Sequence, residues 1–252
     1  MINLEKANKE FIKYTNKFDV QNYNIQRKVD HSIRVMNLSK RMAENLNLEQ
    51  EEVELATLIG LLHDIGRFEQ YNIYKTYNDL KSIDHGEAGV EILEDNEYIR
   101  KFVEDNRWDP IIKKAIVNHN KYELEKGLSE QEKSFCNIIK DCDKIDILYL
   151  GTEVYWKEKE KLIQQEKISK EVEELFYNEK LIDNRLKNTQ IDQIIGMISF
   201  IYDINFKESF EIIRKEDYIN KIINRFEFNE DIKERIEKIR KYANDYIKEK
   251  SK

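Results

Sequence analysis

Apolar residues recur at every third or fourth position along most of the chain, which is the spacing of one buried face of an α-helix. Residues 25–48 show this stripe, which is formed by Val35, Leu38, Met42 and Leu46. Residues 53–62 are apolar on nearly all sides, which is typical of a helix buried at the centre of a domain. We expect this central helix to run into His63 and Asp64 and to stop near Gly66, a residue type common at helix ends.

Helix starts are indicated by side chains that can cap the free amide groups of a first turn. Asp84, with Glu87 three residues later, fits a capping box and predicts a helix that continues through Ile99. Asp109 before Pro110 places an N-cap residue ahead of a proline at the first helical position.

The second half of the chain keeps the helical pattern. Ser129 and Glu132 form another capping box, and the helix after them is expected to carry Asp143 on its inner face. Residues 229–250 form a last amphipathic helix, which we expect to pack on the body of the protein or on a second subunit as a homodimer. The pattern stays helical beyond Gly151, and no segment competes as a strand.

Composition supports an all-α fold. The chain has seven glycines and one proline in 252 residues, whereas average usage would give about 30 in all. Folds built on many tight turns, such as sandwiches, barrels and doubly wound sheets, are therefore disfavoured. We expect a helical domain over residues 1–150 and a helical C-terminal extension, residues 151–252, packed on it.

Charge and cysteine usage narrow the function classes. The net charge is −7, so no general electrostatic case for nucleic-acid binding exists. No segment looks like a signal peptide or is apolar for long enough to span a membrane. Two cysteines six residues apart match no metal or redox spacing, and we expect a cytoplasmic protein with both thiols reduced.

The four histidines are the informative residues, because each falls on a helix face or at a helix end. His31 and His119 continue apolar stripes, whereas His63 ends the central helix and His85 lies in a first helical turn. Any one of them could be an ordinary hydrogen-bonded core residue. Several buried imidazoles and carboxylates together must be hydrogen-bonded or bound to metal, since burying them without partners costs several kcal/mol.

The order of these residues resembles the HD-domain superfamily of metal-dependent phosphohydrolases. The resemblance rests on His31, the pair His63-Asp64 and Asp143, in the contexts LATLIGLLHDIGRFEQ and IIKDCDKIDIL, and it covers residues 27–150. It implies an all-helical HD-domain bundle and a metal-dependent hydrolase. Asp141 and Asp146 lie close to Asp143 in sequence; Asp143 is preferred as the ligand because its neighbours one turn away are apolar.

Further residues are similar to those of the two-metal branches of the superfamily. His85 and His119 match their additional histidines, and the stretch HGEAGVEIL is similar to a helix of HD-GYP phosphodiesterases. Arg67 stands where those enzymes have a phosphate-contacting lysine. The sequence departs from them in having Asn118 before His119 and no Gly-Tyr-Pro motif, so a cyclic-dinucleotide substrate is not supported.

The resemblance implies a ligand set and roles. One ion would be held by His31, His63, Asp64 and Asp143, and a second by Asp64, His85 and His119, with Asp64 bridging. Imidazole and carboxylate ligands suit Mn, Fe, Co, Ni or Zn ions, and we expect one or two of them. Asp64 and Arg67 are the predicted catalytic residues, and Arg67 and Lys144 the predicted contacts to a substrate phosphate.

These expectations lead to hydrolysis of a nucleotide or another small phosphate ester or anhydride by a metal-activated water. Two alternatives stay open. Some HD-domain proteins use a similar ligand set as di-iron oxygenases, and the chain could instead be a non-catalytic module that binds a nucleotide and signals through its C-terminal helices.

Overall fold

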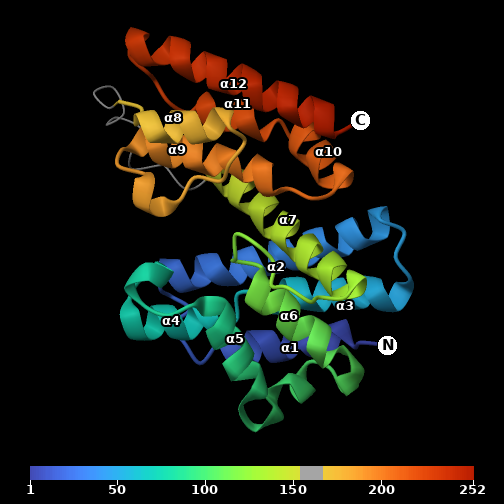
Figure 1. The fold of residues 1–252 in the computed structure, drawn as a ribbon. Coiled ribbons are helices and arrows are strands. Elements are labelled where there is room, and N and C mark those ends of the chain that lie inside the picture. The colour runs from blue at the N-terminus through green and yellow to red at the C-terminus, as the bar shows by residue number, and fades with distance from the viewer. Residues whose placement is uncertain (154–166) are drawn as a thin grey trace. The chain divides into compact units, whose positions relative to one another are not determined.

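The computed structural model describes residues 1–153 and 167–252, and all the regular elements in these ranges are helices, as predicted (Figure 1). The chain divides into two compact units: an N-terminal unit, Met1–Asp143, and a C-terminal unit, Lys144–Lys252. The helical pattern predicted beyond Gly151 includes residues 154–166, which lie outside the described residues. No helix in the described ranges is both long enough and apolar enough to cross a membrane.

The N-terminal unit contains six complete α-helices and most of a seventh. They are α1 (Leu4–Thr15), α2 (Tyr23–Asn45), α3 (Gln50–Leu62), α4 (Gly66–Tyr74), α5 (His85–Glu94), α6 (Asp109–Asn118) and α7 (Glu130–Glu153), which extends ten residues past the division between the units. Three short 3₁₀ helices lie between them: η1 (Asp79–Lys81), η2 (Asp95–Lys101) and η3 (Asn106–Trp108).

Helix α3 forms the centre of the N-terminal unit, as its pattern predicts. Every residue of α3 from Val53 to Leu62 is buried, and α1, α2 and α6 pack against the helix. Gly60 allows a close approach of α2, because a Cβ atom there would lie 2.9 Å from the backbone oxygen of Val35 on that helix. The residues that follow α3 are therefore held at a fixed place in the core.

Three predicted helix boundaries were wrong. Gly66 does not end the central helix; α3 ends at Leu62, and Gly66 is the first residue of α4. The helix after Asp84 ends at Glu94 and not beyond Ile99, because Asn96 and Glu97 adopt left-handed backbone angles, with φ of 48° and 55°. Asp109 is the first residue of α6 and not its N-cap.

Other predicted boundaries are confirmed. The Asp84 side chain accepts hydrogen bonds from the amides of Gly86 and Glu87 at the start of α5. Ser129 and Glu132 exchange hydrogen bonds at the start of α7. The last helix, α12, follows Asn229 and ends at Lys250.

The C-terminal unit packs short helices around isoleucine and phenylalanine side chains. Its complete helices are α8 (Lys170–Tyr177), η5 (Asn184–Leu186), α9 (Gln190–Ile198), η6 (Ser199–Asp203), α10 (Lys207–Lys215), α11 (Tyr218–Ile223) and α12 (Glu230–Lys250). Helix α12 buries Ile232, Ile236 and Ile239 on one face and contacts α10 and α11. This unit therefore has an apolar core of its own.

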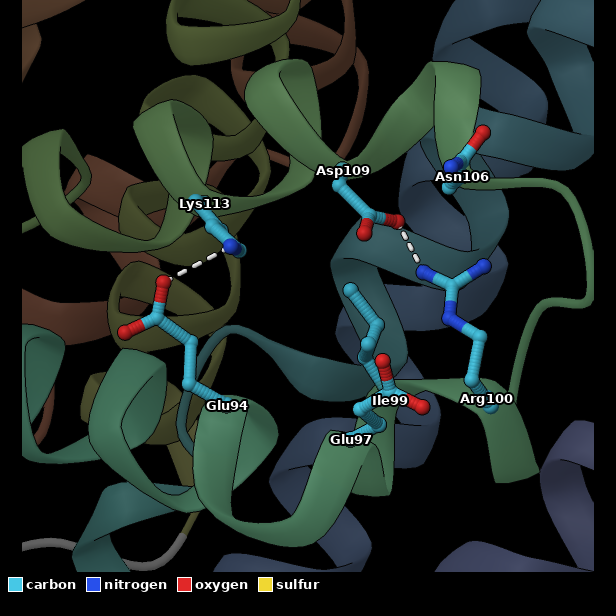
Figure 2. A pocket seen from close by; sticks show the side chains of 7 residues that line it. All are labelled: Glu94, Glu97, Ile99, Arg100, Asn106, Asp109 and Lys113. Carbon is cyan, nitrogen blue, oxygen red and sulfur yellow. Dashed lines mark hydrogen bonds and ion pairs between the residues drawn. The ribbon is translucent and has the colours of Figure 1, made fainter.

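A pocket of about 340 Å³ lies beside η2 and the start of α6 (Figure 2). Its charged groups largely neutralise one another, since Lys113 pairs with Glu94 and Arg100 pairs with Asp109. The pocket contains none of the residues predicted to bind metal or substrate; it is lined by Glu94, Glu97, Ile99, Arg100, Asn106, Asp109 and Lys113.

Candidate metal centre

All six predicted metal ligands lie in the N-terminal unit. His31 is on α2, His63 and Asp64 directly follow α3, His85 is the first residue of α5, His119 directly follows α6, and Asp143 is on α7. The four histidines and Asp64 are buried, each with at most 2 % of its surface exposed. Helix ends from distant parts of the sequence therefore bring these side chains together.

The Asp64 carboxylate lies between two pairs of imidazoles. Its Oδ2 atom is 3.3 Å from Nε2 of His31 and 3.6 Å from Nε2 of His63. Its Oδ1 atom is 3.4 Å from Nε2 of His85 and 3.6 Å from Nε2 of His119. Each carboxylate oxygen thus faces a different pair of histidines.

Asp143 completes the first of these groups. Its Oδ1 atom lies 3.1 Å from Nε2 of His31 and 3.7 Å from Nε2 of His63. Burial alone would raise the pKa of Asp143, but the close approach of His31 and His63 to its carboxylate holds it well below the usual value. Asp143 is therefore ionised, as a metal ligand must be.

Two of the histidines are oriented by the backbone of their own helix. Nδ1 of His63 donates a hydrogen bond to the carbonyl oxygen of Gly60, at 2.8 Å, and Nδ1 of His119 donates to the carbonyl oxygen of Ile116, at 2.6 Å. A carbonyl oxygen can only accept, so the proton of each neutral ring is on Nδ1. The lone pair of each ring is then on Nε2, the atom that faces Asp64.

His85 is oriented by a second carboxylate. Its Nδ1 atom lies 2.6 Å from Oδ2 of Asp79. Burial and then the nearby Arg67 charge lower the pKa of His85 to about 4, so the ring is neutral near pH 7. Burial alone would raise the pKa of Asp79, but its contact with His85 and the Arg67 charge hold it below its usual range. The neutral ring therefore donates through Nδ1 and keeps its lone pair on Nε2.

These tautomers leave lone pairs facing each other. Nε2 of His85 and Nε2 of His119 are 3.0 Å apart, and neither nitrogen carries a proton to share. In the other group, Nε2 of His63 is 3.1 Å from Nε2 of His31. Lone pairs at this distance repel unless a cation or a proton lies between them. The donor set therefore fits divalent ions, and its mixture of imidazole and carboxylate favours a transition metal.

Candidate ion-binding groups can be defined from geometry alone. Ligand atoms of His31, His63 and Asp64 lie within 4.8 Å of one another, as do those of Asp64, His85 and His119. A third group, Asp79, Asp84 and His85, meets the same distance criterion. Asp84 in this group already forms an ion pair with Lys121, and Asp79 with Arg67.

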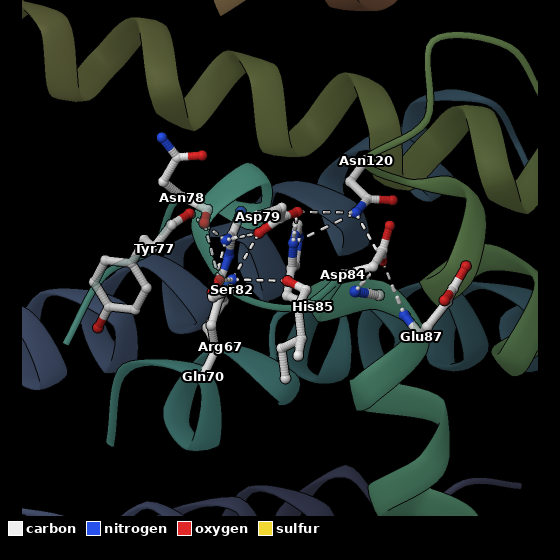
Figure 3. Close-up of polar contacts among 12 residues, drawn as sticks. Arg67, Gln70, Tyr77, Asn78, Asp79, Ser82, Asp84, His85, Glu87 and Asn120 are labelled. Atoms are coloured by element: carbon white, nitrogen blue, oxygen red, sulfur yellow. Dashed lines mark hydrogen bonds and ion pairs between the residues drawn. The ribbon is translucent and has the colours of Figure 1, made fainter. Parts of the chain in front are cut away.

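Arg67 lies beside the centre and is held in place (Figure 3). Its Nη1 atom donates to Oε1 of Gln70, the carbonyl oxygen of Tyr77 and Oδ1 of Asp79, at 2.7–2.8 Å. Its Nε atom is 3.4 Å from Oδ1 of Asp64. Arg67 is therefore a fixed positive charge next to the carboxylate shared by both histidine pairs.

Lys144, the other predicted substrate contact, belongs to the C-terminal unit. Its ammonium group pairs with Oδ2 of Asp203 at 2.7 Å, and 8 % of its side chain is exposed. Asn118, which precedes His119, uses both ends of its side-chain amide in hydrogen bonds to the backbone. It donates to the carbonyl oxygen of Lys114 and accepts from the amide of Glu125.

Two residues of the site were missed in the sequence. Lys28 lies 2.5 Å from Oδ2 of Asp64, and Asp79 orients both His85 and Arg67. Lys28 could have been found, because it precedes His31 by three residues and so shares its helix face. Asp79 carries no such signal, since it lies in a short 3₁₀ turn without periodicity.

The match to a family model agrees with this geometry. The model of the HD domain matches residues 29–148, which include every predicted metal ligand. Searches of curated proteins and of solved structures found no match. The family consists mostly of metal-dependent hydrolases, and the histidine and aspartate groups could hold a metal. Residues 29–148, just under half of the chain, are therefore similar to the HD domain in sequence.

Proposed function

We propose that the protein is a metal-dependent phosphohydrolase that acts on a nucleotide or another small phosphate ester or anhydride. The observation that carries the proposal is the position of Asp64, with Oδ2 next to His31 and His63 and Oδ1 next to His85 and His119. A carboxylate in this position can serve two ions at once. Paired divalent ions, when bound, lower the pKa of a water and stabilise the oxygens of a phosphoryl group.

The residues of this chain would divide the work as follows. His31, His63, Asp64 and Asp143 would hold one ion, and Asp64, His85 and His119 would hold the second. Asp79 would keep His85 in the tautomer that can bind a metal, through the hydrogen bond to Nδ1. Arg67, fixed by three acceptors, would contact an oxygen of the substrate phosphate.

Electrostatics support an anionic substrate. Three carboxylates, Asp64, Asp79 and Asp143, and two cations, Lys28 and Arg67, are gathered at the centre with the four histidines. Two divalent ions would add four positive charges, which exceeds the net charge of −1 on these three carboxylates and two cations. A phosphate group would then be attracted to the centre even though the whole chain is acidic.

The first experiment is metal analysis of the native protein, followed by a screen of nucleotides and phosphate esters with each candidate ion. We expect one to two transition-metal ions per chain and hydrolysis that depends on them. Mixed-valent iron with no hydrolysis under any ion would contradict the proposal and favour oxygen activation.

Substitution of the shared ligand provides the sharper test. Asp64→Ala should lose both the bound metal and hydrolysis, because it removes a ligand from both groups. Asp30→Ala is the matched control, since Asp30 lies next to His31 on α2 but is exposed and accepts a hydrogen bond from Gln26. Hydrolysis that survives in Asp64→Ala would refute the assignment.

A further inference from the structure

Lys28 is a largely buried lysine at the centre, and it is not one of the predicted metal ligands. It lies on α2 three residues before His31, and its Nζ atom is 2.5 Å from Oδ2 of Asp64. Its side chain is 17 % exposed, whereas that of Asp64 is 3 % exposed. Lys28 is therefore the more exposed partner of this ion pair.

The two cations at the centre are held very differently. Among the described residues, the ammonium of Lys28 has one hydrogen-bond acceptor, Asp64, and otherwise lies 5.6 Å from the centre of the Tyr77 ring. The guanidinium of Arg67 lies 5.9 Å from the centre of the same ring but is fixed by three acceptors (Figure 3). Lys28 can thus move on its flexible stem, whereas Arg67 keeps its place.

Lys28 binds the same carboxylate oxygen of Asp64 that would bind a metal ion. Oδ2 of Asp64 is the atom that faces His31 and His63, and it is also the acceptor of the Lys28 ammonium. Two cations on one oxygen repel each other. An ion bound by these histidines would therefore favour a position of Lys28 away from Oδ2, still beside Arg67 and the Tyr77 ring.

We infer that Lys28 has two roles: it neutralises Asp64 before metal is bound, and it binds the phosphate of the substrate together with Arg67 afterwards. The inference rests on the proposed function, because it takes the substrate to be a phosphate compound. It makes Lys28 a substrate-binding residue and not a metal ligand. It also assigns the phosphate to the side of the centre where Lys28, Arg67 and Tyr77 meet.

The test uses inorganic phosphate as the probe, so it does not depend on turnover. Titration calorimetry would measure phosphate binding to the 252-residue chain loaded with Mn²⁺. Lys28→Met should weaken phosphate binding about tenfold, the lower end of what a hydrogen bond to a charged group contributes. Lys40→Met, an exposed lysine on the same helix that pairs with Glu44, should change nothing.

Metal binding provides the second measurement. Because Lys28→Met removes a competitor for Oδ2, it should bind Mn²⁺ at least as tightly as the original protein. Its melting temperature should also rise more on adding Mn²⁺, since the metal-free variant leaves Asp64 without its ammonium partner. Lys28→Gln, measured in the same way, guards against a variant-specific folding defect.

Two results would overturn the inference. One is unchanged phosphate affinity in Lys28→Met and Lys28→Gln; the other is loss of Mn²⁺ from both variants, which would make Lys28 a structural support of Asp64. Failure of the proposed function has a different signature: the original protein would bind Mn²⁺ and phosphate but hydrolyse no phosphate compound in the screen.

Discussion

Asp79→Asn is the substitution that best separates the ligands from the residue that orients them. Oδ1 of Asp79 accepts from Arg67 and Gln70, both at 2.7 Å, and Oδ2 accepts from Nδ1 of His85 at 2.6 Å. An asparagine has one acceptor oxygen. If that oxygen keeps Arg67 and Gln70, the amide NH₂ faces Nδ1–H of His85, donor against donor.

His85 can relieve this conflict by moving its proton to Nε2, which removes the lone pair from the side of Asp64. We therefore expect binding of the second ion to weaken about 10- to 100-fold, the usual effect of losing such an orienting partner. This corresponds to about 1.4–2.7 kcal/mol of binding free energy. The ion held by His31, His63 and Asp143 should be retained.

The same substitution should also lower stability. A hydrogen bond to a charged group contributes about 1.5–3 kcal/mol. Since the Asp79 side chain is 29 % exposed, we take the lower end, about 1.5 kcal/mol. For a chain of this size, this is a fall in melting temperature of about 3–6 °C.

Three measurements check the expectation for Asp79→Asn. Native mass spectrometry gives the number of ions, competition with a chelator gives each affinity, and ¹⁵N chemical shifts give the tautomer of His85. The control is Asp84→Asn, because asparagine also caps helices well and the Asp84 side chain accepts hydrogen bonds from the backbone amides of Gly86 and Glu87 at the start of α5. A second ion that binds Asp79→Asn as tightly as the original protein would refute the reasoning.

The remaining predictions concern pH and packing. The pKa of His85 is about 4 in the folded protein and near 6.5 when unfolded, so only the unfolded chain gains a proton between these values. Metal-free protein should thus lose about 3 kcal/mol of stability as the pH falls from 6.5 to 4, and His85→Asn should flatten this slope in urea unfolding. Gly66→Ala should destabilise by about 1–3 kcal/mol and weaken metal binding, since its Cβ would lie 2.3 Å from the backbone oxygen of His85. A higher melting temperature for Gly66→Ala would contradict this.

The central part of the fold could be predicted because its signal is periodic. The buried run of residues 53–62 and most of the stripe on residues 25–48 follow from hydrophobic spacing alone: the run lies in α3, and the stripe lies in α2 up to Asn45, where that helix ends. Boundaries fixed by long-range packing could not be predicted in this way. Gly66 is the first residue of α4, where its backbone approaches His85 and Gly89 closely, and no local sequence pattern indicates that contact.

Some residues of the candidate site could likewise be predicted from the sequence, and others could not. The histidines and Asp64 could be proposed from the sequence, because they stand at helix ends and on inner faces in an ordered set. The partners that orient them could not, because Asp79 lies in an irregular turn and contacts Arg67 and His85 only in the folded chain. Lys28 lies between these cases, since its helix face was visible but its pairing with Asp64 was not.

The hydrogen bonds from His63 and His119 to carbonyl oxygens of their own helices have an entropic consequence. Immobilising a side chain on binding costs about 0.5–1.5 kcal/mol. Here the two rings lose their rotational freedom when the helices form, before any ion arrives. The free-energy cost of ordering side chains when an ion binds is therefore lower by about 1–3 kcal/mol. An ion can also leave and be replaced without rearrangement of either helix end.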